Sequence, residues 1–149
     1  MFKRFLSNKK GMTLIEIMVV VAIIAGITGL IAVNVVGRQK TANINLTKTA
    51  ISNVIDALDQ YYVDNHDYPT TDQGLDALVH KPSGGRAPEN YPEEGYMKKV
   101  PKDSWGHEYN FANPGSHGDK IEVWSNGPDG QEGSDDDIVS WDIDTEKGQ

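Results

Sequence analysis

Apolar residues in the first part of the chain form one long run and then recur at helical spacing. The run covers residues 12–36, in which Glu16 is the one charged residue. Beyond it, apolar positions recur at steps of three, four and seven, the spacing of an amphipathic helix. They are Ile44, Ile51, Val54, Ile55, Leu58, Tyr61 and Tyr62. The pattern predicts one helix from Met12 to about Asp64, on the order of 80 Å long at about 1.5 Å per residue.

The rest of the chain predicts shorter elements. Thr70 and Gln73 form a capping-box pattern that opens a second helix ending near His80. Residues 81–103 are rich in proline and glycine, which predicts a long irregular connection. Its anchors in the core are predicted to be Tyr91, Tyr96, Met97 and Val100.

Three short segments near the C-terminus carry alternating or aromatic-rich residues bounded by turn residues. They span residues 108–112, 120–125 and 138–143, and they predict a small antiparallel sheet. Packing this sheet against the amphipathic half of the long helix gives an α+β fold. The predicted inward residues are Tyr109, Phe111, Ile121, Val123, Val139 and Trp141.

Charge is unevenly distributed around the apolar run. Residues 1–11 contain no acid and four basic residues: Lys3, Arg4, Lys9 and Lys10. An apolar run of this length can cross a bilayer core of roughly 30 Å, and the basic flank places residues 1–11 in the cytoplasm. The competing interpretation is a cleaved secretory signal, but its apolar core usually covers only about 7–15 residues. We therefore expect an anchor, with the chain after Arg38 exported.

Glu16 is the anomaly in this run, because an acid at the centre of a spanning helix costs roughly 2.5–3.5 kcal/mol. One interpretation is that it lies near enough to the interface to be tolerated. The other requires cleavage after Gly11, which would create an α-amine at Met12, one turn from Glu16. That amine and the carboxylate could then pair within a chain or between neighbouring chains.

Composition narrows the functional classes. The chain has 149 residues, no cysteine and a formal net charge of −8. These values favour one modest domain, exclude thiol and cysteine-metal chemistry, and oppose binding to nucleic acid. The sequence contains no catalytic motif, and its histidines (His66, His80, His107 and His117) are scattered. We therefore expect that the chain is not an enzyme.

An acidic loop forms the second chemical signal. Five acids lie between Asp129 and Asp137, among Gly127, Gly130 and Gly133. Repulsion among these carboxylates would be relieved by a hard cation such as Ca²⁺, which takes 6–8 oxygen ligands. The spacing does not match the EF-hand pattern, so the residues alone leave a solvated loop and a metal site both open.

The N-terminal residues resemble the class III signal of type IV pilin-like proteins. The resemblance lies in residues 9–21, KKGMTLIEIMVVV. It implies that a prepilin peptidase cleaves between Gly11 and Met12 and methylates the new amine. The usual residue after the cut is phenylalanine, so Met12 departs from the pattern, while Gly11 and Glu16 match it.

Most of the remaining chain is similar to the major pseudopilins of type II secretion systems. The matching segments are residues 68–75, 105–106, 113–118, 127–130 and 136–141. The resemblance implies a pilin-like fold and a Ca²⁺ ion in the acidic loop. The implied ligands are the carboxylates of Asp129, Asp136 and Asp137, the backbone carbonyl of Asn126 and an oxygen of Gln131, with Asp135 solvated.

The resemblance also implies a function and its partners. Residues 1–11 would be a cytoplasmic leader that is cleaved, residues 12–37 a transmembrane and filament-core helix, and residues 38–149 a periplasmic domain. The chain would form a homopolymer at the inner membrane of a Gram-negative bacterium, with minor pseudopilins, an assembly platform and a secretion ATPase as partners. The alternatives are a type IV pilin of an adhesion or motility fibre, and a monomeric membrane-tethered calcium-binding domain.

Overall fold

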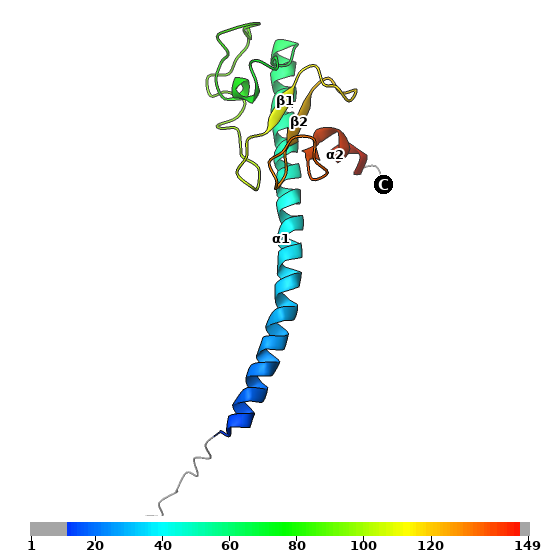
Figure 1. The fold of residues 1–149 in the computed structure, drawn as a ribbon. Coiled ribbons are helices and arrows are strands. Elements are labelled where there is room, and N and C mark those ends of the chain that lie inside the picture. The colour runs from blue at the N-terminus through cyan, green and yellow to red at the C-terminus, as the bar shows by residue number, and fades with distance from the viewer. Residues whose placement is uncertain (1–11, 147–149) are drawn as a thin grey trace, which may run out of the picture. The chain divides into compact units, whose positions relative to one another are not determined.

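The computed structural model describes residues 12–146, with side chains for residues 12–27 and 37–143. In chain order its elements are α1 (Leu14–Asn65), the 3₁₀ helix η1 (Leu75–Leu78), β1 (Asn110–Ala112), β2 (Glu122–Ser125), β3 (Ile138–Val139) and α2 (Ser140–Glu146) (Figure 1). The chain divides into two compact units, Met1–Lys40 and Thr41–Gln149. The predicted leader, residues 1–11, lies outside the described residues.

The predicted long helix is confirmed as α1, and its apolar stripe forms the centre of the core. Within the unit Thr41–Gln149, Ile51, Val54 and Leu58 are fully buried, and Tyr61 is nearly so. They pack with residues of the sheet and of η1 in one hydrophobic cluster. The helix ends at Asn65, and His66 then adopts a left-handed backbone with φ 61°. The helix therefore provides the surface on which the unit is assembled.

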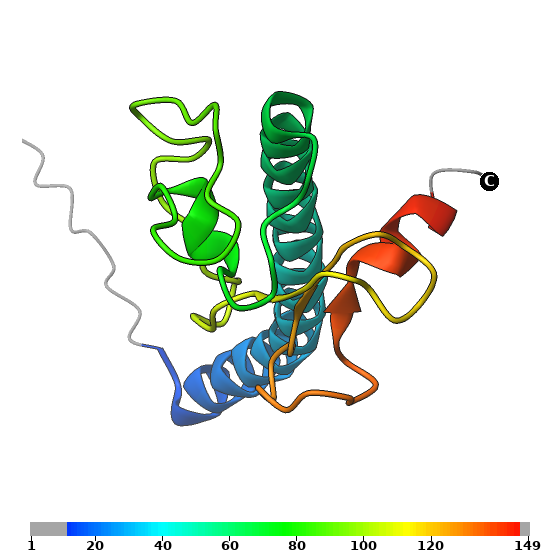
Figure 2. The same ribbon diagram turned by 90° about the horizontal axis from the view of Figure 1, so that it is seen from above.

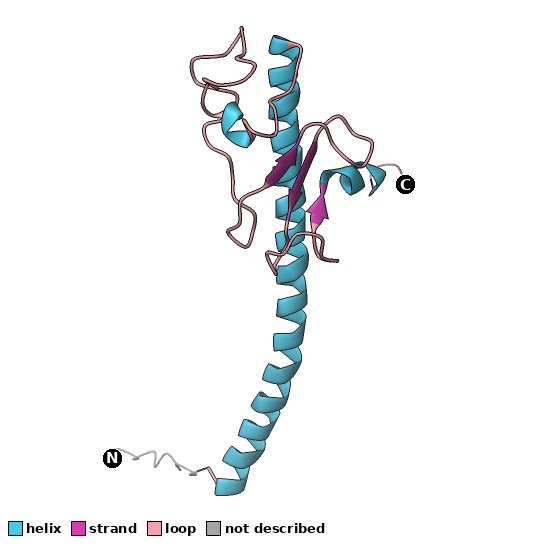
Figure 3. Ribbon diagram, turned by 45° about the horizontal axis from the view of Figure 1, so that its top comes forward, coloured by secondary structure: helices cyan, strands magenta, loops and turns pink. Residues whose placement is uncertain are grey.

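The sheet has the order β1-β2-β3, with both pairs antiparallel. Phe111 on β1 is opposite Val123 on β2, and Ser125 on β2 is opposite Ile138 on β3. Figure 3 shows the three strands lying against the C-terminal half of α1. This arrangement confirms the α+β fold, and Tyr109, Phe111 and Val123 are buried as predicted.

The segment predicted as the third strand is mostly helical. Strand β3 stops at Val139, and α2 begins at Ser140, whose Oγ accepts a hydrogen bond of 3.1 Å from the backbone N–H of Val123. The core is therefore completed by Ile138 and Ile143. The prediction that Val139 and Trp141 point inward was wrong, since both are only partly buried and neither belongs to the cluster. Ile121 is partly buried and packs against the cluster, as predicted.

The segment between α1 and β1 lies on one side of α1, and α2 lies on the other (Figure 2). The capping box is confirmed: Thr70 N–H donates to Gln73 Oε1 at 2.9 Å, and Gln73 N–H donates to Thr70 Oγ1 at 3.3 Å. The predicted helix is shorter, because Gly74 with φ 61° interrupts it before η1. The predicted anchors of the long connection do pack against the core: Tyr91, Tyr96, Met97 and Val100.

A buried carboxylate lies on β2. Glu122 is 2% exposed, and its Oε1 accepts a 2.5 Å hydrogen bond from the backbone N–H of His117. Its Oε2 accepts a 3.2 Å bond from Ser116 Oγ, and the His117 ring stacks on Trp141 with centroids 4.0 Å apart. Burial alone would raise the pKa of Glu122, but the bonds from His117 and Ser116 outweigh it and the pKa is lowered.

Replacing Glu122 with glutamine tests this arrangement. A lowered folded-state pKa means that the ionised carboxylate stabilises the fold above the ordinary value of 4.5, and that this contribution is lost as pH falls through the folded-state pKa. We expect Glu122→Gln to lower the free energy of unfolding by about 1–3 kcal/mol at pH 7. The difference from the parent should shrink below pH 4.5. Urea titrations at several pH values measure it, with the exposed Glu108→Gln as the control.

Candidate functional site

The acidic loop of residues 126–137 joins β2 to β3 and contains three glycines with positive φ. Gly127, Gly130 and Gly133 have φ angles of 62°, 69° and 84°. A side chain at Gly127 would clash with the backbone carbonyl of Asp136, so the two ends of the loop are in close contact. Glycine is required there both by the left-handed conformation and by the space.

Three predicted calcium ligands converge on the hydroxyl of Ser134. Ser134 Oγ lies 2.5 Å from Asp136 Oδ1, 3.2 Å from Asp137 Oδ1 and 3.4 Å from Asp129 Oδ1. A serine hydroxyl has one hydrogen and can donate it to one of these oxygens at a time. The loop therefore gathers more negative charge and more acceptor oxygens than this hydroxyl can satisfy.

The other predicted ligands are placed differently. Gln131 donates its backbone N–H to Asp129 Oδ1 at 2.9 Å. The side chain of Asn126 points to β1, where its Oδ1 accepts from Asn110 Nδ2 at 2.7 Å, and its backbone carbonyl accepts from Gly130 N–H at 3.2 Å. Asp135 is exposed. The structure thus brings the three carboxylates together, with Asn126 and Gln131 at the edge of the group.

The donor chemistry of the loop fits a hard cation. Carboxylate, hydroxyl and carbonyl oxygens are the ligands that Ca²⁺ prefers, and the loop offers no nitrogen or sulfur donor side chain of the kind that favours softer metals. Among the described residues, no group of three or more histidine or acidic side chains is already arranged to hold a metal ion. Binding of a cation would therefore require these carboxylates to rearrange. Their role as ligands stays a prediction.

Ser134 was missed by sequence reasoning, which considered the acids and glycines of the loop. A signal was present, because Ser134 directly precedes three consecutive acids in the sequence. Serine hydroxyls commonly bond to groups two or three residues further along the chain. Its contacts with Asp136 and Asp137 follow this local pattern.

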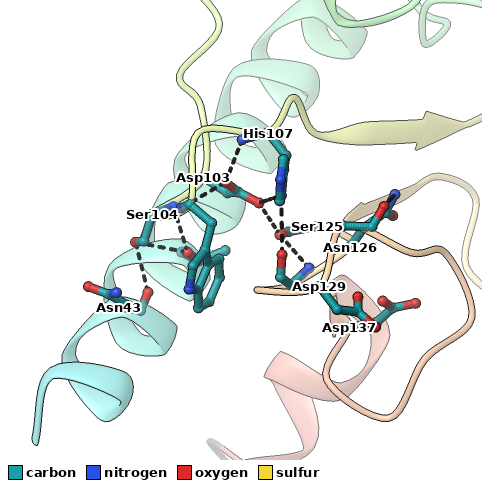
Figure 4. A network of polar contacts seen from close by, with 12 residues as sticks. Asn43, Asp103, Ser104, His107, Ser125, Asn126, Asp129 and Asp137 are labelled. Carbon is teal, nitrogen blue, oxygen red and sulfur yellow. Dashed lines mark hydrogen bonds and ion pairs between the residues drawn. The ribbon is translucent and has the colours of Figure 1, made fainter. Parts of the chain in front are cut away.

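A second buried carboxylate, that of Asp103, lies beside the loop and contacts Ser125, the residue directly before it (Figure 4). The side chain of Asp103 is 0% exposed. Its Oδ1 accepts from the N–H of His107 at 2.8 Å, and its Oδ2 accepts from Ser125 Oγ at 2.6 Å. Burial raises the pKa of Tyr109 to about 12, and the charge of Asp103 contributes to the rise. Sequence reasoning missed Asp103, because its partner Ser125 lies on β2, more than twenty residues later.

In two places a serine, a histidine and an acid are in contact, but neither group has the geometry of a catalytic triad. The first group is Ser116, His117 and Glu122, and the second is Ser125, His107 and Asp103. Both Ser116 Oγ and Glu122 Oε1 face Nδ1 of His117, at 3.2 and 3.1 Å, whereas a relay needs the two ring nitrogens. In the other group, Ser125 donates directly to Asp103. These hydroxyls are partners of buried carboxylates.

At the N-terminal end, Glu16 forms a capping box with Thr13. The backbone N–H of Thr13 lies 3.4 Å from Glu16 Oε2, and the N–H of Glu16 donates to Thr13 Oγ1 at 3.3 Å. An acid in the first turn also favours the positive end of the helix dipole. Sequence reasoning missed this role of Glu16, although the T-x-x-E pattern was visible. Gly11, the predicted cleavage residue, lies outside the described residues.

Large apolar side chains cover the start of α1. In the unit Met1–Lys40, the eleven large apolar residues described from Met12 to Ile27 are each between 48% and 81% exposed. Exposed apolar surface of this extent marks contact with another protein or with lipid. Within the described residues, no helix has both the length and the apolar character needed to span a membrane. The predicted span also includes residues 28–36, whose side chains lie outside the described part.

Two protein-family profiles match the chain, one at each end. The profile described as "Prokaryotic N-terminal methylation motif" matches residues 6–32. The profile described as "Type II secretion system (T2SS), protein G" matches residues 34–141. The second match covers more than half of the chain.

Individual relatives agree with the profiles. Type II secretion system core protein G of Escherichia coli strain K12 is 42% identical over 147 residues, covering 97% of this chain and 99% of the relative. The protein of the same name from Vibrio cholerae is 44% identical, covering 91% and 94%.

A solved structure extends the agreement to the fold. The crystal structure of the major pseudopilin from the type 2 secretion system of enterohaemorrhagic Escherichia coli matches with a TM-score of 0.67 and 40% identity. The match covers 73% of this chain and 95% of that one. The family of type II secretion system G proteins is a family of structural pseudopilins and not of enzymes. The sequence, the fold and these relatives together show that the chain belongs to the family of type II secretion system G proteins, the major pseudopilins.

Proposed function

We propose that this chain is the major structural subunit of a pseudopilus, a helical periplasmic fibre whose growth drives protein export across the outer membrane. The observation that carries the proposal is the pair of profile matches, which join an N-terminal methylation motif to a protein G domain in one chain. The exposed apolar residues of α1 support it, because a fibre core of packed helices would bury them.

Before assembly, the precursor is anchored in the inner membrane as a single span. The support for this step lies in the sequence: residues 12–36 are apolar apart from Glu16, and residues 1–11 are basic. The prepilin peptidase then removes residues 1–11 and methylates Met12. The domain after Arg38 remains in the periplasm.

Assembly replaces contact with lipid by contact with other copies of α1. Because acyl chains are as apolar as the helices, hydrophobic transfer gives little net drive, and packing and pairing set the register. In this proposal, the carboxylate of Glu16 pairs with the Met12 amine of a neighbouring copy. Minor pseudopilins, the assembly platform and a cytoplasmic ATPase act with the homopolymer.

The acidic loop holds a structural Ca²⁺ in this proposal. Asp129, Asp136 and Asp137 supply carboxylates, and their convergence on one hydroxyl supports the assignment. Asn126 and Gln131 supply further oxygens, and Ser134 is placed to supply another. When bound, the ion neutralises repulsion among the carboxylates, so that folding of the loop and binding of the metal are linked.

Removing one carboxylate tests the metal site. At a calcium concentration one hundred times the Kd, the ion should stabilise the parent by about 2.7 kcal/mol. Asp136→Ala should lose this gain, become more sensitive to protease and assemble poorly. The matched control is the exposed Asp135→Ala, which should keep the gain. Thermal unfolding with and without calcium measures it. Equal stabilisation of Asp136→Ala and the parent would contradict the assignment.

Mass spectrometry of the N-terminus tests processing. Protein from cells that contain a prepilin peptidase should begin with methylated Met12. Protein from cells that lack the enzyme should retain residues 1–11. Retention of Lys3 to Gly11 in both would exclude the processed subunit and favour a simple anchor.

Two substitutions at the start of α1 separate charge from capping. Glutamine also serves in a capping box, so Glu16→Gln removes the charge and keeps an oxygen for the Thr13 N–H. Thr13→Ala removes the cap, which costs roughly 1 kcal/mol, and keeps the charge. We expect Glu16→Gln to reduce cross-linked ladders of α1 about tenfold or more, equivalent to about 1.4 kcal/mol. Thr13→Ala should retain them. Full ladders from Glu16→Gln would refute the pairing.

A further inference from the structure

Asp103 lies in the middle of a series of polar contacts that runs from the acidic loop to α1 (Figure 4). We propose that Asp103 and its neighbours couple the loop of residues 126–137 to the Asn43–Thr47 turn of α1. A change in the loop then alters the local stability of that helical turn. The coupling itself depends on the polar contacts alone, and its response to calcium rests on the function proposed above.

On the loop side, Asp103 acts through Ser125 and His107. Ser125 Oγ donates to Asp103 and accepts from the backbone N–H of Gly127 at 3.1 Å. His107 Nδ1 lies 3.2 Å from the carbonyl oxygen of Gly127. Both backbone polar groups of Gly127 are thus tied to residues that bond to Asp103. Gly127 is packed against Asp136. A movement of Asp136 would therefore also move Gly127, which contacts Ser125 and His107.

On the helix side, the contacts continue through Ser104, the next residue in the chain. Ser104 Oγ donates to the carbonyl oxygen of Asn43 at 2.9 Å and accepts from Thr47 Oγ1 at 3.1 Å. The backbone N–H of Ser104 lies 3.3 Å from Thr47 Oγ1. The turn that begins at Asp103 is therefore fastened to two residues one helical turn apart on α1.

Burial makes these contacts depend on one another. Asp103, Thr47 and Ser125 are almost completely buried, so water cannot easily replace a lost partner. A buried carboxylate that loses a donor carries a large desolvation cost, more than that of a neutral group. The network is therefore more stable complete than partly formed. Opening the loop at Gly127 withdraws a partner of Ser125 and His107, and the turn at Asp103 and Ser104 loses its fixed position.

The helical end of the network lies close to the boundary between the two units, which falls after Lys40. Asn43 and Thr47 belong to the first turns of α1 within the unit Thr41–Gln149. Their side of the helix is tied down by Ser104, which reaches them from a segment about sixty residues later in the chain. A change in the conformation of the loop of residues 126–137 would thus alter the contacts of Asn43 and Thr47, close to the start of the unit Thr41–Gln149. Coupling of this kind is reciprocal, so stabilising the turn also favours the closed loop.

Hydrogen exchange of the full chain in detergent, without calcium, tests the coupling directly. Ser125→Ala, Ser104→Ala and the double variant are compared at the amides of residues 43–48. We expect Ser125→Ala to speed exchange there about fivefold or more. Its effect should be much smaller when Ser104 is already alanine, because only the contact of the residue 104 backbone N–H with Thr47 Oγ1 then remains. Ser52→Ala is the matched control, because Ser52 Oγ donates within α1, to the carbonyl oxygen of Lys48. In the Ser52→Ala background, Ser125→Ala should keep its full effect.

A calcium arm separates this coupling from the proposed metal site. Calcium should slow exchange in residues 126–137 of both the parent and Ser104→Ala, and should slow exchange in residues 43–48 much more in the parent than in Ser104→Ala. Protection of the loop without any response of residues 43–48 to calcium or to Ser125→Ala would overturn the coupling and leave the metal site intact. If calcium changes nothing while Ser125→Ala still reaches residues 43–48, the coupling stands and the metal assignment fails.

Discussion

The burial of one apolar stripe of α1 is the interaction on which the folded unit depends. A three-stranded sheet with strands of two to four residues cannot form a core by itself. Ile51, Val54 and Leu58 give it a continuous apolar surface, and the strands, η1 and α2 all contribute residues to the same cluster. The acidic loop is positioned through β2 and β3, which it joins and which contribute Val123 and Ile138 to this cluster.

Local patterns predicted most of this architecture. The helix α1 and its stripe follow from apolar spacing over many turns, which averages out the exceptions, and the capping box of Thr70 and Gln73 needs residues only three positions apart. The error at α2 has the same local origin. Residues 139–143 alternate between apolar and polar like a strand, and a helix of seven residues is too short to display its own period. Where β3 ends, Ser140 Oγ accepts a hydrogen bond from the backbone N–H of Val123, which is distant in sequence.

In the candidate site, too, features set by neighbouring residues could be predicted, and features set by residues distant in sequence could not. The acids and glycines of the loop are contiguous, so their importance could be predicted, and the structure does bring Asp129, Asp136 and Asp137 to one hydroxyl. The supporting residues could not be found in this way. Asp103 has no special sequence context, and its burial results from contacts with Ser125 and His107 that exist only after folding. Both buried carboxylates, Asp103 and Glu122, hold loops that local patterns describe only as irregular.

The position of Ile143 in the core has a consequence for how the chain acquires its structure. Ile143 follows the end of α1 by more than seventy residues, yet it packs in the same cluster as residues of α1. A polypeptide that emerges from a ribosome or a translocation channel with its N-terminus first can form the helix early, because helical contacts are local. The cluster stays incomplete until α2 has emerged, because Ile143 belongs to it. The core of the unit is therefore completed late, well after α1 can form.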